Sequence, residues 1–241
     1  VEILRRASLE DLSYGLPKQY GELFPTLADY FSTAFDYGDE AVAAYFKEYR
    51  QLKISNTITD SFIERAFNFV VPTAYRTRHA VIAELAGRPD TALLVVDAFG
   101  AEYMPLLLAM ANRLGMNIES RAIVTANLPT ETVFNTIEWD KFRTLPEIRR
   151  VDSIVHDGVA KHEASIPERN FAETLRVFET EIMNGIADGL TRFDRVVVTA
   201  DHGATRLAVI ARSENKGVTL PWDKKRDGEP KDWRYTIDPA G

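Results

Sequence analysis

The chain has 241 residues, with 29 Lys and Arg against 36 Asp and Glu, a formal net charge of −7 at pH 7, and no cysteine. With 45% apolar residues it is long enough to build a sizeable core, as one domain or two small ones. The absence of cysteine excludes disulfides, thiolate nucleophiles and cysteine-ligated zinc, so a metal ion would be held by Asp, Glu or His. The acidic balance argues against broad nucleic-acid binding, although a local cationic site stays open.

The apolar runs are too short for a membrane-spanning helix. The longest, at 93–96 and 106–111, fall well below the roughly 18 residues that cross a bilayer. No charged and then apolar leader follows Val1, so nothing indicates export. We therefore expect a soluble, cytoplasmic protein without membrane contacts. The missing initial methionine is consistent with a fragment of a longer protein.

Residues 1–88 have the pattern of a helical lead-in region. Behind Asp39 and Glu40, apolar residues recur at i, i+3 and i+4 up to Leu52, and a second such pattern runs over 59–69 after capping residues. Gly, Pro and Asp at 87–90 then punctuate the chain. We expect an α/β domain over 89–241, truncated at its C-terminus, because the charged tail at 212–233 leaves the sheet without completing it.

Two continuous apolar runs predict strands buried on both faces, as in a parallel sheet. They cover 92–96, which Asp97 ends, and 195–200, which Asp201 ends. A third strand is predicted at 120–126. Helical or helix-entering patterns lie between and before them, at 106–114 with Gly115 as a stop, 129–137 and 167–190, and a further apolar stretch follows at 207–211. This alternation predicts an α/β fold with a doubly wound, mostly parallel sheet.

Polar residues that end buried strands point to a site, because ligands bind outside the carboxyl ends of strands in open α/β sheets. Asp97 and Asp201 are two such residues, and His202 and Gly203 follow the second directly. An aspartate here can also simply cap the following turn. Two of them, one beside a histidine, favour a functional site, and Gly203 would let the backbone turn sharply enough to present both side chains.

A second acid and imidazole pair is Asp152 and His156, four residues apart. On a helix this spacing places both side chains on one face, where they could bind the same ion. Such pairs are more often surface salt bridges. Asp157 and His162 form a rival pair in the same segment, and we favour the first.

Residues 127–135 contain a candidate nucleophile. Pro129 favours entry into a helix whose first free N–H groups could bind an anion, and Thr130 is a natural N-cap. The hydroxyl of Thr132 is of more interest, because a hydroxyl at a phosphate-binding helix end can be ionised by a metal ion and act as the nucleophile.

Three motifs occur in an order that resembles the alkaline phosphatase superfamily. They are Asp97-Ala98-Phe99, Pro129-Thr130-Glu131-Thr132 and Thr199-Ala200-Asp201-His202-Gly203. The block looks most like the PglZ domain of bacterial phage-exclusion (BREX) systems, over about 92–212, half of the chain. The last motif is also similar to the metal motif of cofactor-independent phosphoglycerate mutases, although the stretch between Thr132 and Asp152 is too short for the cap domain that a phosphomutase needs.

The resemblance implies an alkaline-phosphatase-like α/β/α sandwich and a metal-dependent phosphohydrolase or phosphodiesterase. It implies two divalent ions, Zn²⁺ first, with Mn²⁺ or Mg²⁺ as alternatives. Asp97, Asp201 and His202 match the ligands of one ion, and Asp152 and His156 match a pair that binds the second. Thr132 matches the nucleophile, which would form a phosphothreonine intermediate. The substrate would be a phosphate ester, and other defence-system proteins would be partners; nucleic acid is a possible partner that the net charge does not indicate.

The chain also departs from the superfamily pattern. No histidine follows His202, where relatives usually complete the second metal site, and the basic residue that many carry after the first aspartate is missing near Gly100. These departures support a different function class. In that alternative the chain is a catalytically incomplete PglZ module that acts as an interaction platform in a defence complex.

Overall fold

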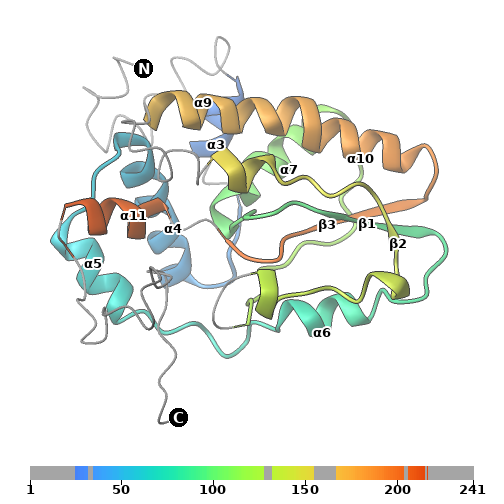
Figure 1. Ribbon diagram of the computed structural model, residues 1–241, viewed down its shortest axis with the longest axis horizontal. Coiled ribbons are helices and arrows are strands. Elements are labelled where there is room, and N and C mark those ends of the chain that lie inside the picture. Colours follow the sequence, from blue (N-terminus) through green and yellow to red (C-terminus); the bar gives the residue numbers. More distant parts are fainter. Residues whose placement is uncertain are drawn as a thin grey trace, which may run out of the picture.

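The computed structural model describes residues 25–31, 35–127, 132–154, 167–203, 206–214 and 216. They form a small three-stranded parallel sheet flanked by helices, together with an N-terminal helical part (Figure 1). The strands are β1 (Thr91–Val95), β2 (Arg143–Thr144) and β3 (Arg195–Thr199), in the spatial order β2-β1-β3. The sequence prediction of a mixed α/β fold with a parallel sheet is confirmed at this level.

The central strand β1 explains the continuous apolar run at 92–96. All five residues of β1 are buried, with β2 on one side and β3 on the other. Its side chains alternate between two cores: Leu94 packs in the larger cluster, with Leu106 and Ile186, and Leu93 packs with Ile82 on the other face. The predicted strand at 195–200 is also confirmed, but β3 lies at one of the two edges of the described sheet and its residues are only half-buried.

The predicted strand at 120–126 is wrong. Only Thr125 makes a β-bridge, to Thr77, and its backbone exchanges hydrogen bonds with Arg76 and Arg78 rather than with β3. Its apolar residues have a different use, because Ile123 packs on the cluster around Phe35, Tyr37 and Val42. The short strand β2 was not predicted, since it consists of two exposed polar residues with no apolar pattern.

The helical lead-in contains α3 (Pro25–Phe31), α4 (Glu40–Ser55), α5 (Asp60–Phe67) and α6 (Arg78–Ala83). Side chains cap α4 and α5: Asp39 accepts a hydrogen bond from the Val42 N–H at 3.0 Å, and Thr59 accepts one from the Phe62 N–H at 3.1 Å. The sequence predicts capping residues for the second of these helices. Further along, α11 (Arg206–Ser213) covers the helical part through a shared apolar cluster.

The larger core lies between the sheet and α7 (Met104–Arg113), α9 (Pro167–Val177) and α10 (Met183–Leu190). A π-helical segment, η5 (Phe178–Ile182), joins α9 to α10, so the predicted long helix over 167–190 is confirmed with a π turn inside it. In Figure 1 these helices lie on one side of the sheet and α6 on the other. The 3₁₀ turns are η2 (Ala101–Tyr103), η3 (Thr132–Phe134) and η4 (Trp139–Lys141).

The lead-in shares this core, because Tyr30, Phe31 and Ile54 belong to the same cluster as Leu94. The boundary between residues 88 and 89 stays a prediction. The predicted tail loop lies almost wholly outside the described residues, as do Pro129, Thr130, His156, Asp157 and His162. None of the described helices combines the length and the apolarity that a bilayer crossing requires.

Candidate metal centre

The carboxyl end of β1 brings two distant aspartates together. After β2, the chain continues alongside β1: the Ile148 N–H donates to the Val95 carbonyl at 3.0 Å, and the Asp97 N–H donates to the Ile148 carbonyl at 2.9 Å. A helical turn at 150–154 follows this pairing in the chain and lies at the same end of the sheet. Asp152 is part of that turn. Beyond Asp97 the chain turns sharply at Ala98, whose φ is +59°.

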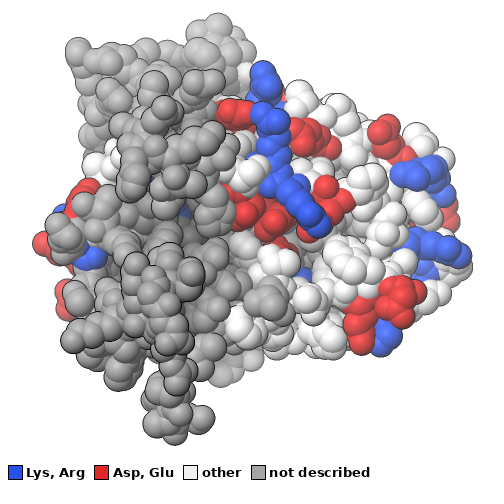
Figure 2. All heavy atoms as spheres, in the orientation of Figure 1, with Lys and Arg blue, Asp and Glu red and all other residues white. Residues whose placement is uncertain are grey.

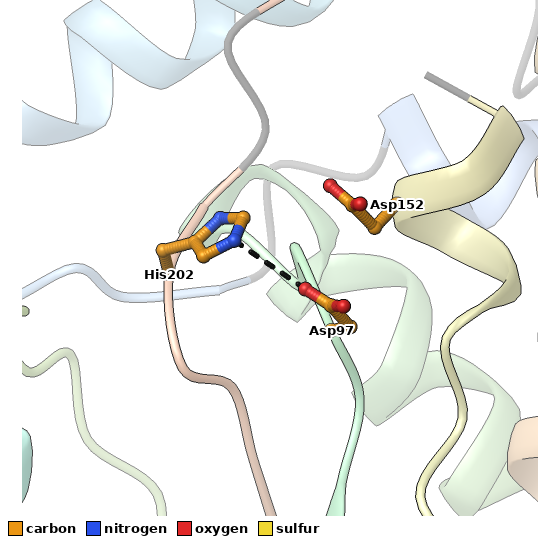
Figure 3. Close-up of side chains that lie close together, drawn as sticks. All are labelled: Asp97, Asp152 and His202. Carbon is orange, nitrogen blue, oxygen red and sulfur yellow. Dashed lines mark ion pairs between the residues drawn. The ribbon is translucent and has the colours of Figure 1, made fainter. Parts of the chain in front are cut away.

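Asp97, Asp152 and His202 form the candidate metal centre (Figure 3). One ligand atom of each residue lies within 4.8 Å of those of the other two. Nδ1 of His202 is 3.0 Å from the carbonyl oxygen of Gly203, which can only accept, so Nδ1 carries the hydrogen. In the neutral ring Nε2 then presents a lone pair, as in metal-ligating histidines whose other nitrogen donates to a carbonyl.

The atoms that face each other in this centre suit a cation. Nε2 of His202 lies 3.4 Å from Oδ1 of Asp97, and that oxygen is buried without a hydrogen-bond partner. Two acceptors therefore face each other with no donor between them, an arrangement that costs free energy unless a proton or a metal ion joins them. The donor set of carboxylate oxygen and imidazole nitrogen fits a divalent ion such as Zn²⁺ or Mn²⁺.

The local charges favour a cation as well. Burial and, after it, the neighbouring carboxylates of Asp201 and Asp152 together raise the pKa of Asp97 from 3.8 to about 7, while His202 opposes the rise. The ionised carboxyl of Asp97 is therefore unfavourable in the protein alone. A bound divalent cation would reverse this balance.

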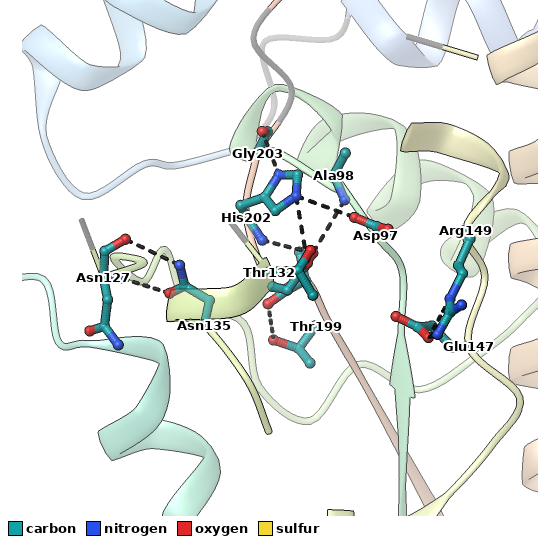
Figure 4. A network of polar contacts seen from close by, with 12 residues as sticks. Asp97, Ala98, Asn127, Thr132, Asn135, Glu147, Arg149, Thr199, His202 and Gly203 are labelled. Carbon is teal, nitrogen blue, oxygen red and sulfur yellow. Dashed lines mark hydrogen bonds and ion pairs between the residues drawn. The ribbon is translucent and has the colours of Figure 1, made fainter. Parts of the chain in front are cut away.

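Asp201 adjoins the centre and orients its neighbours. Its Oδ1 accepts hydrogen bonds from the backbone N–H of His202 at 2.8 Å and of Ala98 at 3.4 Å. Its Oδ2 lies 3.5 Å from Nε2 of His202 and accepts a hydrogen bond from the hydroxyl of Thr132 at 2.5 Å (Figure 4). The carboxylate is buried, whereas the Thr132 side chain is exposed to solvent. Thr132 is thus accessible and held at the edge of the centre.

Asn127 and Asn135 lie at the two ends of the segment that carries Thr132 and are hydrogen-bonded to each other. Oδ1 of Asn135 accepts from the Asn127 N–H at 2.7 Å, and its Nδ2 donates to the Asn127 carbonyl at 3.2 Å. The Asn127 side chain donates in turn to the Phe134 carbonyl at 3.1 Å (Figure 4). Asn135 is 1% exposed, so the pair ties the exposed Asn127, at one end of the segment, to a buried residue at the other end.

Arg78 links this segment to β3, and sequence reasoning did not identify it. Its guanidinium donates to the carbonyl of Ala200, directly before Asp201, at 3.3 Å, and to the carbonyl of Asn135. Arg78 is 5% exposed; burial lowers its pKa, and the charge of Asp201 opposes this. A lone arginine at the start of a helix normally lies on the surface, so the sequence offers no signal for this role.

The structure brings together four of the predicted site residues, Asp97, Thr132, Asp201 and His202. It also places Asp152 against Asp97 and His202, whereas the sequence assigned Asp152 to a separate pair with His156. His79 is exposed on α6 and does not belong to this cluster.

We compared the chain with protein-family models, with curated proteins and with solved structures, and no match was found in any of the three. The assignment of a function therefore depends on the residues and the geometry of this centre.

Proposed function

We propose that the chain is a metal-dependent phosphohydrolase or phosphodiesterase of the alkaline phosphatase superfamily, of PglZ type, with Thr132 as its nucleophile. One observation carries the proposal: an Asp97, Asp152 and His202 ligand set adjoins a hydroxyl that is hydrogen-bonded to Asp201. An accessible hydroxyl, an acceptor for its proton and a cation-binding cluster are the groups that phosphoryl transfer to an enzyme nucleophile requires.

Asp97, Asp152 and His202 would hold a divalent ion, with Asp201 beside them as a further oxygen donor. A bound ion would neutralise the charge that develops on the phosphoryl oxygens. A second ion, expected from Asp152 and His156, depends on a residue outside the described part of the chain.

The residues themselves carry the steps of the reaction. Asp201 orients the Thr132 hydroxyl and accepts its proton as the oxygen attacks phosphorus. The bond from phosphorus to the Thr132 oxygen forms while the bond to the leaving oxygen breaks, and the leaving oxygen takes a proton from solvent, which leaves a phosphothreonine and a free alcohol. Water then attacks phosphorus and loses a proton to solvent, the bond from phosphorus to Thr132 breaks, and Asp201 returns the proton to the threonine oxygen as phosphate departs.

The proposed biological setting comes from the sequence resemblance alone. It is bacterial anti-phage defence, with a phosphate ester as substrate and other defence-system proteins as partners. On the described part of the face in Figure 2, acidic and basic side chains are interspersed, which fits a small ester better than a long polyanion.

Hydrolysis of 4-nitrophenyl phosphate and of its diester with Zn²⁺ or Mn²⁺ tests the proposal. We expect nitrophenolate release that stops in Thr132→Ala and persists in Thr180→Ala, a matched change of an exposed threonine on the helix surface. The proposal fails if the purified chain binds no divalent ion by calorimetry and Thr132→Ala leaves any activity unchanged.

A second candidate is a catalytically incomplete module that serves as an interaction platform. It is favoured by the single ligand cluster found among the described residues, which offers three donors for one ion. This candidate predicts that one ion binds and that no ester is hydrolysed. Full metal-dependent turnover would exclude it.

A further inference from the structure

A pocket of about 320 Å³ adjoins the candidate metal centre. Asp201 and His202 line one part of it, beside Gly100 and Gly203. The two glycines allow this approach, because a Cβ on Gly203 would lie 3.3 Å from the Cα of Gly100. The pocket therefore opens beside two residues of the proposed site.

Away from the centre, the lining is apolar and rich in aromatic rings. It includes Phe46, Phe69, Phe99, Met104 and Val124. Tyr75 contributes its ring as well, since its hydroxyl already donates to the carbonyl of Tyr37 at 2.6 Å. The volume lies at the small end of the range for ligand pockets, enough for one ring system. Planar aromatic groups pack well against such side chains in offset or edge-to-face contacts.

Arg78 also lines the pocket and supplies an unused donor. Two nitrogens of its guanidinium serve the carbonyls of Ala200 and Asn135, whereas Nε is buried without a hydrogen-bond partner. A buried donor without a partner costs about 1–3 kcal/mol, which a ligand acceptor could recover. The preferred group is therefore an aromatic ring that carries an acceptor atom.

From these observations we propose that the pocket is the leaving-group subsite and binds the aromatic group of a phosphate ester. This inference rests on the proposed function for the position of the phosphoryl group. A simple aryl group and a nucleobase share the flat ring, but only the nucleobase carries an acceptor for Nε of Arg78, and the experiment below separates them.

The first measurement is kcat/KM for phosphate release from benzyl phosphate, adenosine 5′-monophosphate and ethyl phosphate, which are all esters of primary alcohols with similar leaving-group basicity. We expect the ring-bearing esters to exceed ethyl phosphate by about tenfold or more, the effect of burying one ring. The ring-bearing ester with the higher kcat/KM shows whether the subsite prefers a simple aryl group or a nucleobase. Equal values for all three esters would overturn the subsite.

Substitutions in the pocket lining test whether the ring of the ester binds there. Val124→Trp, which adds bulk to the pocket lining, and Phe69→Ala, which removes a ring, should each lower kcat/KM for the ring-bearing esters about fivefold or more and leave ethyl phosphate unchanged. Phe67→Ala is the matched control, because Phe67 is 61% exposed and does not line the pocket. Equal losses for ethyl phosphate and the ring-bearing esters would overturn the proposal.

Calorimetric binding to the metal-free chain separates this proposal from the proposed function. Benzyl phosphate should bind more tightly than ethyl phosphate, and Val124→Trp should abolish the difference. If no ester is hydrolysed but this pattern holds, the subsite stands and the proposed hydrolase fails. If esters are hydrolysed without this preference, the hydrolase stands and the subsite is wrong.

Discussion

The hydroxyl of Thr132 donates a hydrogen bond to Oδ2 of Asp201 across 2.5 Å, joining residues 69 positions apart in the chain. Asp201 in turn accepts from the backbone N–H of His202, so the hydroxyl of the nucleophile candidate and the main chain of His202 share one carboxylate. Charge-assisted hydrogen bonds of this length are the strong ones, and they fix direction as well as distance.

Thr132→Ser should retain measurable activity, because it keeps the hydroxyl, whereas Thr132→Val should lose at least about 10³-fold in kcat, since it removes the atom that attacks phosphorus. Both can be followed by nitrophenolate release. Acid-quenched turnover followed by peptide mass spectrometry should place a phosphoryl group on Thr132. Phosphate on another residue, or full activity of Thr132→Val, would disprove this role.

Asp97→Asn should stabilise the metal-free chain while weakening metal binding. The raised pKa of Asp97 means that its stabilising contribution is complete below its ordinary value of 3.8 and is lost as the pH rises through about 7. With a chelator present at pH 8, the variant should melt roughly 2–4 °C above the wild type, equivalent to about 1 kcal/mol. Asp188→Asn, an exposed change on α10, should leave the melting temperature unchanged.

The Asp97 effect has a pH signature that a simple packing gain lacks. The difference in melting temperature between Asp97→Asn and the wild type should shrink as the pH falls from 8 to 4, because the wild-type carboxyl becomes neutral. A difference that is constant over this range would show that charge is not its cause.

Arg78→Met should lower the free energy of unfolding by about 2–4 kcal/mol, because it leaves the buried carbonyls of Ala200 and Asn135 without their donor. Arg76→Met is the matched control. Arg76 is exposed and pairs with Glu84 at the surface, so its loss should cost less than about 1 kcal/mol. Urea unfolding measures both free energies, and equal effects would contradict a stabilising role for the two hydrogen bonds that Arg78 donates.

The packing of α10 on the sheet can be tested with two glycines one turn apart. A Cβ on Gly189 would lie 2.7 Å from side-chain atoms of Leu145 and Val196, so Gly189→Ala should destabilise the fold by about 1–3 kcal/mol. A Cβ on Gly185 would make an ordinary contact at 3.5 Å with Leu94, so Gly185→Ala should be neutral or gain up to about 1 kcal/mol in helix propensity. Thermal unfolding should rank the variants in this order.

The sequence was informative where local pattern determines the structure. Asp97 and Asp201 follow continuous apolar runs, and parallel strands with such runs end at the same edge of a sheet, so their meeting could be predicted. The capping residues before α5 were visible for the same reason, because the side chain of Thr59 acts within three residues.

The rest of the site depends on contacts between distant segments. Asp152 reaches Asp97 because Ile148 pairs with the residue that follows β1. No residue pattern in the sequence predicts this pairing. Arg78 serves two backbone carbonyls, which every residue possesses, so its partners leave no trace in the sequence. The error at 120–126 has a similar origin, since Thr125 pairs with the loop before α6 although its neighbours are as apolar as a buried strand.

The most direct test of the account is an anomalous difference map from crystals of the protein grown with Zn²⁺ or Mn²⁺. The account predicts a peak bonded to the carboxylates of Asp97 and Asp152 and to Nε2 of His202, which is lost in Asp97→Asn. A map with no peak among these three residues, in crystals that contain the ion elsewhere, would contradict the central claim.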